Sequence, residues 1–282
     1  MPNSAPRLEA KRQWTVFALS ALMFARPGHT RAQTDASVPD PCAGRSALFS
    51  LLDRPTVSDS ACVVQPKRVV VEAGYQHAAL TGSGGWSDNL PELELRFGLP
   101  GHNEFVLMPP NFTRQYGASG ALNGGSATVL GIKHALGYSA NWLGAVEALI
   151  TPASGSAAYG SAGTGAAMNG IVAYAPSDTI GISLQAGVST QTEPSLSGGG
   201  RYFSINPLLT FTWNPRWNWQ YYLEIYGQSH VGPGEAAGDN ADGGVQFLIS
   251  PSVELDLEEG MRLHGDLGGF THYTGVGLGL LF

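Results

Sequence analysis

Charge is scarce in this sequence, and so are long apolar runs. Asp, Glu, Lys and Arg make up 13% of the 282 residues, against about 25% in average proteins. The formal net charge is −7 and no run of Lys or Arg offsets it, which argues against nucleic acid as a partner. No apolar run after the first 25 residues reaches the roughly 20 residues of a transmembrane helix. Few charges, with 38 glycines and 10% aromatic residues, suit a protein whose outer surface faces lipid.

Cysteine is scarce as well, because the chain contains only Cys42 and Cys62. Neither has the further nearby ligands of a metal site or the neighbouring histidine of a catalytic thiol, so we expect no metal and no cofactor. In an exported protein two such cysteines form a disulfide by default. Closing a loop of that length would stabilise the fold by about 3 kcal/mol on the chain-entropy estimate.

The first 32 residues have the parts of a secretory signal. Lys11 and Arg12 form a basic region, Trp14–Ala25 is apolar, and Thr30-Arg31-Ala32 provides small residues before a cleavage site after Ala32. The apolar stretch is too short to span a bilayer, which favours a cleaved signal (residues 1–32) over a retained anchor. Export also places both cysteines in an oxidising compartment.

From residue 67 to residue 282 the sequence alternates between polar and apolar positions in about twelve segments. Period-two alternation is typical of strands whose two faces meet different surroundings, and segments of roughly 9–11 residues can cross a membrane as tilted strands. The expected strands are Arg68–Gln76, Pro91–Leu99, Asn103–Met108, Thr128–Tyr138, Trp142–Ile150, Met168–Ala175, Ile180–Val188, Tyr202–Trp213, Trp217–Gln228, Gly243–Ile249, Val253–Glu258 and Thr271–Phe282.

The last segment, Thr271–Phe282, has glycines on one face and large apolar residues on the other. It ends on the aromatic Phe282 and in this resembles the closing strand of bacterial outer-membrane barrels, which is their assembly signal. The resemblance implies the barrel-assembly machinery as a partner. A soluble β-sandwich or β-helix is the alternative, because its strands also alternate. Aromatic residues near strand ends and isolated carboxylates on the polar faces favour the barrel.

The lengths of the turns and loops predict which end of the barrel is periplasmic and which is extracellular. Short turns are expected at Ser177-Asp178, Asn214-Pro215-Arg216 and Ser250-Pro251-Ser252, and longer loops at Gly82–Asn89, Phe112–Gly125, Thr151–Gly165, Thr190–Gly200 and Ser229–Asp242. Periplasmic turns are short and extracellular loops are long. We therefore predict an all-β, antiparallel transmembrane barrel of about 12 strands, a monomer in the lipid of the bacterial outer membrane. Both chain ends are expected on the periplasmic side.

Residues 33–66 precede the barrel. They are expected to form a periplasmic N-terminal segment clipped by the disulfide, or a segment inserted into the lumen. Ala47–Leu52 is its one plausible helical turn.

Several blocks resemble the outer-membrane transporter family named after the Met-A pathway of phenol degradation. The blocks are Cys42–Ser50, Leu52–Cys62, Val70–Gln76, Leu90–Leu93, Leu95–Leu99, Tyr222–Gly227, Val253–Asp256 and Gly275–Phe282. The resemblance implies a barrel that passes aromatic compounds through the outer membrane. These are fold motifs, so they support the barrel more strongly than the solute.

Charged and tyrosine side chains on the polar faces are expected to line the lumen. The candidates for a solute path are Glu72, Glu94, Arg96, Lys133, Glu147, Tyr222, Glu224, Tyr226, Glu254, Asp256 and Glu258. One interpretation is a structural polar network that fills a small barrel. The other is a narrow wet path whose acidic lining disfavours anions.

The expected function is therefore a passive channel for small solutes, including aromatic or hydrophobic ones. The alternatives are a non-conducting structural or adhesive barrel and an outer-membrane lipid-modifying enzyme. No catalytic residues are proposed, because His134 has no evident nucleophile beside it in sequence and no metal or phosphate-binding motif occurs.

Overall fold

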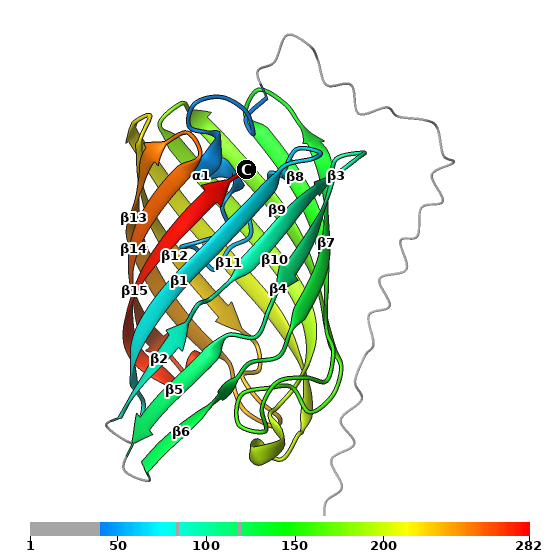
Figure 1. The fold of residues 1–282 in the computed structure, drawn as a ribbon, viewed down its shortest axis with the longest axis vertical. Coiled ribbons are helices and arrows are strands. Elements are labelled where there is room, and N and C mark those ends of the chain that lie inside the picture. Colours follow the sequence, from blue (N-terminus) through cyan, green and yellow to red (C-terminus); the bar gives the residue numbers. More distant parts are fainter. Residues whose placement is uncertain (1–39, 83–84, 118–119) are drawn as a thin grey trace, which may run out of the picture. The chain divides into compact units, whose positions relative to one another are not determined.

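The alternating segments pair into antiparallel strands that close on themselves (Figure 1). The computed structural model describes residues 40–82, 85–117 and 120–282. The expected signal peptide, residues 1–32, lies outside the described residues. The strands follow the order β15-β14-β13-β12-β11-β10-β9-β8-β7-β4-β3-β1-β2-β5-β6, and β15 also pairs with β1, which closes the barrel.

The described residues contain one α-helix, α1, and fifteen strand segments. The strands are β1 Val69–Leu80, β2 Trp86–Leu90, β3 Glu94–Leu99, β4 Asn103–Met108, β5 Phe112–Gly117, β6 Gly120–Gly125, β7 Val129–Tyr138, β8 Trp142–Thr151, β9 Gly165–Ser177, β10 Ile180–Thr192, β11 Arg201–Arg216, β12 Trp219–Gln228, β13 Gly238–Ser250, β14 Val253–His264 and β15 Phe270–Leu281. Helix α1 is Ala47–Leu51, and the 3-10 turns are η1 Ser195–Ser197 and η2 Leu267–Gly269. None of these helices has the length and apolar character needed to span a bilayer.

Three neighbouring strands of the barrel are each interrupted once. Strand β1 pairs with β3 along Val69–Glu72 and with β2 along Gln76–Ala79, so β2 and β3 are two halves of one strand. The same holds for β4 with β5 and for β6 with β7. Counted this way, the fifteen segments make twelve strands, which confirms the predicted fold.

Prolines explain two of the interruptions. Pro91 and Pro109 have no backbone N–H to give to a ladder, so a strand breaks or bulges there. Side chains hydrogen-bond across the resulting gap: Asn111 Oδ1 accepts the N–H of Glu92 at 3.1 Å, and Ser126 Oγ accepts the N–H of Asn111 at 2.8 Å. The wall remains hydrogen-bonded through side chains.

Some of the loops predicted from the sequence are wrong, because the structure has strands there. Gly82–Asn89 contains most of β2, and Phe112–Gly125 contains β5 and β6. Both stretches are polar or Gly-rich, so their alternation is weak, and they form strands because their neighbours offer free ladder partners. Thr190–Gly200 loses its first residues to β10, and Ser229–Asp242 loses its last to β13.

The expected turn at Asn214-Pro215-Arg216 is also wrong, because it lies within β11. The chain turns instead between Arg216 and Trp219. The pairing of β11 with β12 shifts register between Trp213 and Arg216, and such an irregularity accommodates a proline inside a strand.

The two faces of the wall differ as the alternation predicts. On β12, Leu223 is 66% exposed on the outside, whereas the adjacent Glu224 is 2% exposed. On β14, Leu255 and Leu257 are exposed and Glu254 and Asp256 are buried. The apolar exterior suits lipid, and the polar residues point into the barrel.

We predict that Leu223→Arg destabilises the folded barrel by about 2–4 kcal/mol, the cost of a cation facing lipid near the midplane. Leu223→Met and Glu224→Gln should fold nearly normally, since the first stays apolar and the second keeps a hydrogen-bond acceptor. Heat-modifiability on a gel and urea unfolding in lipid would measure this. Equal tolerance of all three changes would contradict the assignment of the faces.

Candidate functional site: a plug and two cavities in the lumen

Residues 40–68, here called the plug, fold into the barrel before β1 begins. Their helix α1 lies inside the end of the barrel where β15 ends (Figure 1). Leu48 and Phe49 of α1 form a buried apolar cluster with Val70 of β1 and Leu248 of β13. The short apolar run Ala47–Leu52 therefore covers one patch of the inner wall.

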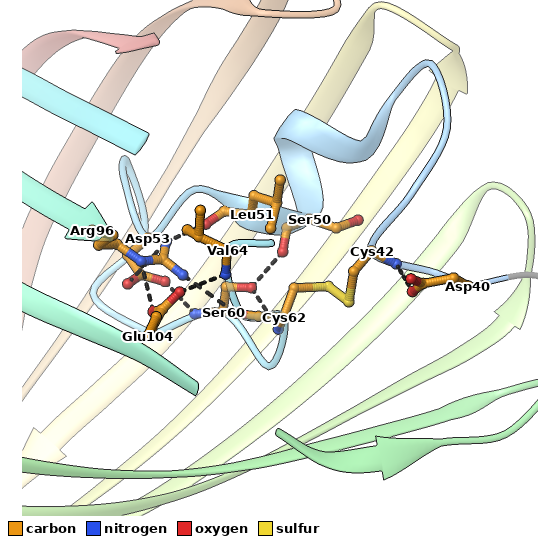
Figure 2. Close-up of a disulfide and its surroundings, with 10 residues drawn as sticks. All are labelled: Asp40, Cys42, Ser50, Leu51, Asp53, Ser60, Cys62, Val64, Arg96 and Glu104. Atoms are coloured by element: carbon orange, nitrogen blue, oxygen red, sulfur yellow. Dashed lines mark hydrogen bonds and ion pairs between the residues drawn. A yellow bond between two sulfur atoms is a disulfide. The ribbon is translucent and has the colours of Figure 1, made fainter. Parts of the chain in front are cut away.

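A disulfide joins the two arms of the plug (Figure 2). Cys42 and Cys62 are 5.6 Å apart between Cα atoms. Beside the bond, Ser60 Oγ accepts the N–H of Cys62 at 2.9 Å and donates to the carbonyl of Ser50. The plug is thus a closed loop that enters the barrel, turns near Val57, and leaves toward β1.

Inward-facing side chains of the wall accept the backbone N–H groups of the plug. A buried N–H without a partner costs as much as a lost hydrogen bond, and an irregular segment in a lumen has no ladder to satisfy it. The bonds are Asp53 N and Arg54 N to Glu72 (2.9 and 2.6 Å), Val57 N and Ser58 N to Glu224 (2.7 and 3.2 Å), Asp59 N to Gln185 (2.8 Å), and Val64 N to Glu104 (2.7 Å). Two predicted lumen carboxylates, Glu72 and Glu224, therefore hold the plug in place together with Glu104 and Gln185, which were not among the predicted residues.

Two buried cations balance the carboxylates on the side of β3, β4 and β7. Arg96 lies 3.2 Å from Asp53, 3.3 Å from Glu72 and 2.9 Å from Glu104. Lys133 lies 3.0 Å from Asp53 and 3.3 Å from Glu104. Both cations have side chains with no exposed surface. Buried charges are tolerated when they are paired and hydrogen-bonded, and Figure 2 shows Arg96, Asp53 and Glu104 meeting beside the disulfide.

Arg54 balances Glu92 and the acidic row, here Asp256 and Glu258 of β14, on the adjoining part of the wall. Its guanidinium lies 2.7 Å from Glu92, 3.4 Å from Asp256 and 3.3 Å from Glu258. Burial alone would lower the pKa of Arg54, but Asp256, Glu258 and Glu92 raise it above its usual value, so the group stays charged.

Arg54 has room because two glycines face it. Gly74 of β1 and Gly277 of β15 are paired in register. A Cβ on Gly74 would overlap the guanidinium, and a Cβ on Gly277 would lie 2.6 Å from Nε of Arg54. A Cβ on Gly279 would similarly collide with Leu52. The glycine face of the last strand is therefore the surface against which the plug packs.

Two cavities flank the plug. The loop-side cavity has a volume of about 480 Å³ and is lined by the tip of the plug, by Tyr159–Ser161 of the β8–β9 loop and by inward residues of β7 to β12. The helix-side cavity has a volume of about 860 Å³ and is lined by α1, by the rest of the plug and by the ends of β8 to β13. The plug thus lies between the two open parts of the lumen.

The structure buries ten of the eleven predicted lumen residues, and none of the ten lines either cavity. The eleventh, Tyr226, lines the loop-side cavity. For Asp256 and Glu258, contact with Arg54 favours the interpretation as a structural network. Tyr222 also contacts the plug, because its hydroxyl donates to the carbonyl of Pro55 at 3.4 Å.

Sequence reasoning missed the plug residues Asp53, Arg54 and Asp59 and the wall residue Glu104. Glu104 falls at an inward position of a weakly patterned strand, so its alternation with Phe105 was the available signal. The plug residues have no such signal, because irregular backbone has no periodicity. No group of three or more His, Cys, Asp or Glu side chains in the described part of the chain is arranged to hold a metal.

A closed antiparallel barrel of twelve strands with cavities in its lumen has the fold of outer-membrane channels. The chain is similar to an outer-membrane channel of Pseudomonas putida F1, with 12% identity, a TM-score of 0.60, and coverage of 82% of this chain and 100% of that one. It is also similar to the NanC porin (11% identity, TM-score 0.51, coverage 75% and 98%) and the KdgM porin (8%, 0.51, 76% and 99%).

These neighbours are channels and porins, and at such low identity the likeness concerns the fold alone. No family model matches the chain and no curated protein matches its sequence. The resemblance to the Met-A family therefore stays a prediction.

We predict that Cys42 and Cys62 are oxidised together in the purified protein. Thiol labelling of the unfolded, unreduced chain should then give no signal. The double change to serine should destabilise the plug by about 3 kcal/mol, because the open chain gains conformational entropy. Limited proteolysis would report that loss as earlier cleavage within residues 40–68. Stoichiometric labelling of the wild type would contradict the prediction.

Arg54→Met should release the plug. The change leaves Asp256 and Glu258 buried without their cation, which costs about 3–5 kcal/mol. Hydrogen exchange of the amides of residues 53–64 should accelerate strongly, while the β ladders stay protected. Arg54→Lys should be milder, and Arg262→Met, which removes an exposed ion pair with Asp266, should have no effect. Unchanged protection in Arg54→Met would show that the acidic row does not anchor the plug.

Proposed function

We propose that the protein is a passive channel of the bacterial outer membrane for small, uncharged solutes, aromatic ones included. The supporting observation is the lining of the loop-side cavity. Of its 26 lining residues, Asp59 is the one that is charged. Of the carboxylates that were expected to form a wet acidic path, Glu72, Glu224, Asp256 and Glu258 contact the plug instead.

The rest of this lining combines apolar side chains with neutral hydrogen-bonding groups. Met108, Val129 and Leu149 form an apolar wall, and Asn169 and Gln185 provide amides on another part. Binding sites for small molecules typically have such mixed linings and volumes of about 300–1,000 Å³. A cavity of about 150 Å³ already holds benzene, so about 480 Å³ accommodates a substituted single-ring solute.

Location and partners follow from other features. The expected export signal, the apolar exterior and the aromatic end of the last strand support the outer membrane and assembly by the barrel-assembly machinery through Phe282. Closure of β15 onto β1 within one chain supports a monomer. The resemblance to the Met-A family agrees with an aromatic solute.

Uptake into proteoliposomes tests the proposal. Phenyl glucoside is uncharged and phenyl glucuronide is an anion of similar size, so neither size nor ring distinguishes them. We expect the glucoside to enter several-fold faster, because Asp59 repels the anion and no cation in the cavity lining attracts it. No uptake of either solute above empty liposomes would overturn the channel function.

Two substitutions at one cavity residue, one charged and one neutral, provide matched variants. Ala167 lines the loop-side cavity. Ala167→Lys should raise glucuronide uptake relative to Ala167→Gln, which has a comparable size without charge. Equal uptake by both variants would show that solute does not pass through this cavity.

A further inference from the structure

One residue lines both cavities. Asp59, at the tip of the plug, belongs to the lining of the loop-side cavity and to that of the helix-side cavity, and the two linings share no other residue. The two open parts of the lumen therefore approach each other at Asp59.

The barrier between the cavities is thinnest along β10 and β11. On β10, the successive inward residues Gln185 and Ser183 line different cavities, and on β11 Leu208 and Thr210 do the same. On β9 the buried Ile171 intervenes and packs with Ala61 of the plug. A passage would therefore run between the plug tip and β10–β11.

On the side of β11, Thr210 donates to Ser58 Oγ of the plug at 2.9 Å, and on the side of β10 amide side chains close the passage. Gln185 Nε2 donates to Asp59 Oδ2 at 2.8 Å, and Gln185 Oε1 accepts the N–H of Asp59 at 2.8 Å. Asn169 Nδ2 donates to the same carboxylate oxygen at 3.0 Å and to Glu147 at 3.1 Å. These amides can rotate without breaking a β ladder, because their backbone groups pair within β9 and β10.

The other sides of the plug are held differently. Arg96 and Lys133 pair with Asp53 on one side, and Arg54 pairs with the acidic row on another. Asp59 has no ion pair with any cation in the described part of the chain. The contact with Gln185 and Asn169 is thus the part of the plug surface that can open while the ion pairs keep the plug in the barrel.

We propose that Asp59 is the selectivity residue of a gate between the two cavities, and that Gln185 and Asn169 close the gate. This inference rests on the proposed channel function. When the amides rotate away, the carboxylate faces the narrowest part of the path, where it excludes anions and favours cations and neutral solutes.

Single-channel recording in a KCl gradient tests the gate. Asp59→Asn keeps the shape and removes the charge, so the ratio of K⁺ to Cl⁻ permeability should fall at least about twofold. Asp59→Ala with Gln185→Ala removes the carboxylate and one of the two amides that close on it, and should raise the conductance. Glu259→Gln, the same charge change on the exposed outer face of β14, should leave both values as in the wild type. Heat-modifiability shows that each variant is folded.

The outcomes separate the gate from the channel. A conducting wild type whose selectivity and conductance are unchanged in both Asp59 variants would overturn the gate and leave the channel function standing. A silent wild type with a conducting double variant would support the gate as the closed barrier. Silence in all folded variants, together with no solute uptake, would overturn the gate and the proposed function together.

Discussion

Hydrogen bonds between inner-wall carboxylates and the backbone of the plug are the interaction on which the rest of the structure depends. The plug has irregular backbone inside a lumen, so its N–H groups cannot join a ladder and need other acceptors. Glu72, Glu104 and Glu224 accept them. Those acids are tolerable because Arg96 and Lys133 are buried beside two of them. The excess of acidic side chains on the inner wall is therefore explained by the plug, whose N–H groups need acceptors.

The same requirement explains the shape of the wall. The strands that contact the plug most closely carry glycine where a side chain would collide with it, as Gly74 and Gly277 do with Arg54. The residues next to these glycines in the sequence point outward and remain apolar, since they meet lipid. One strand thus satisfies two environments through period-two alternation, with glycine on the crowded side and leucine or valine on the other.

The plug also divides the lumen into two cavities with different linings. The ion pairs lie against the wall at the sides of the plug, which leaves the loop-side cavity with neutral walls apart from Asp59. A barrel with many internal charges can in this way present a largely uncharged cavity to a solute. The structural polar network and the proposed solute path, which were alternative interpretations of the same residues, then involve different parts of the lumen.

The sequence by itself determined the barrel, the number of strands and the faces of the well-patterned strands, because alternation is a local property that each strand contains completely. It did not determine β2, β5 and β6, whose Gly-rich or polar segments pair only because adjacent strands are present. It also could not reveal the partners of the carboxylates. Arg54 is 202 residues from Asp256, and Asp59 is 126 residues from Gln185, and irregular backbone has no period that relates them. Only the closed barrel, which brings β10 and β14 around the plug, decided those contacts.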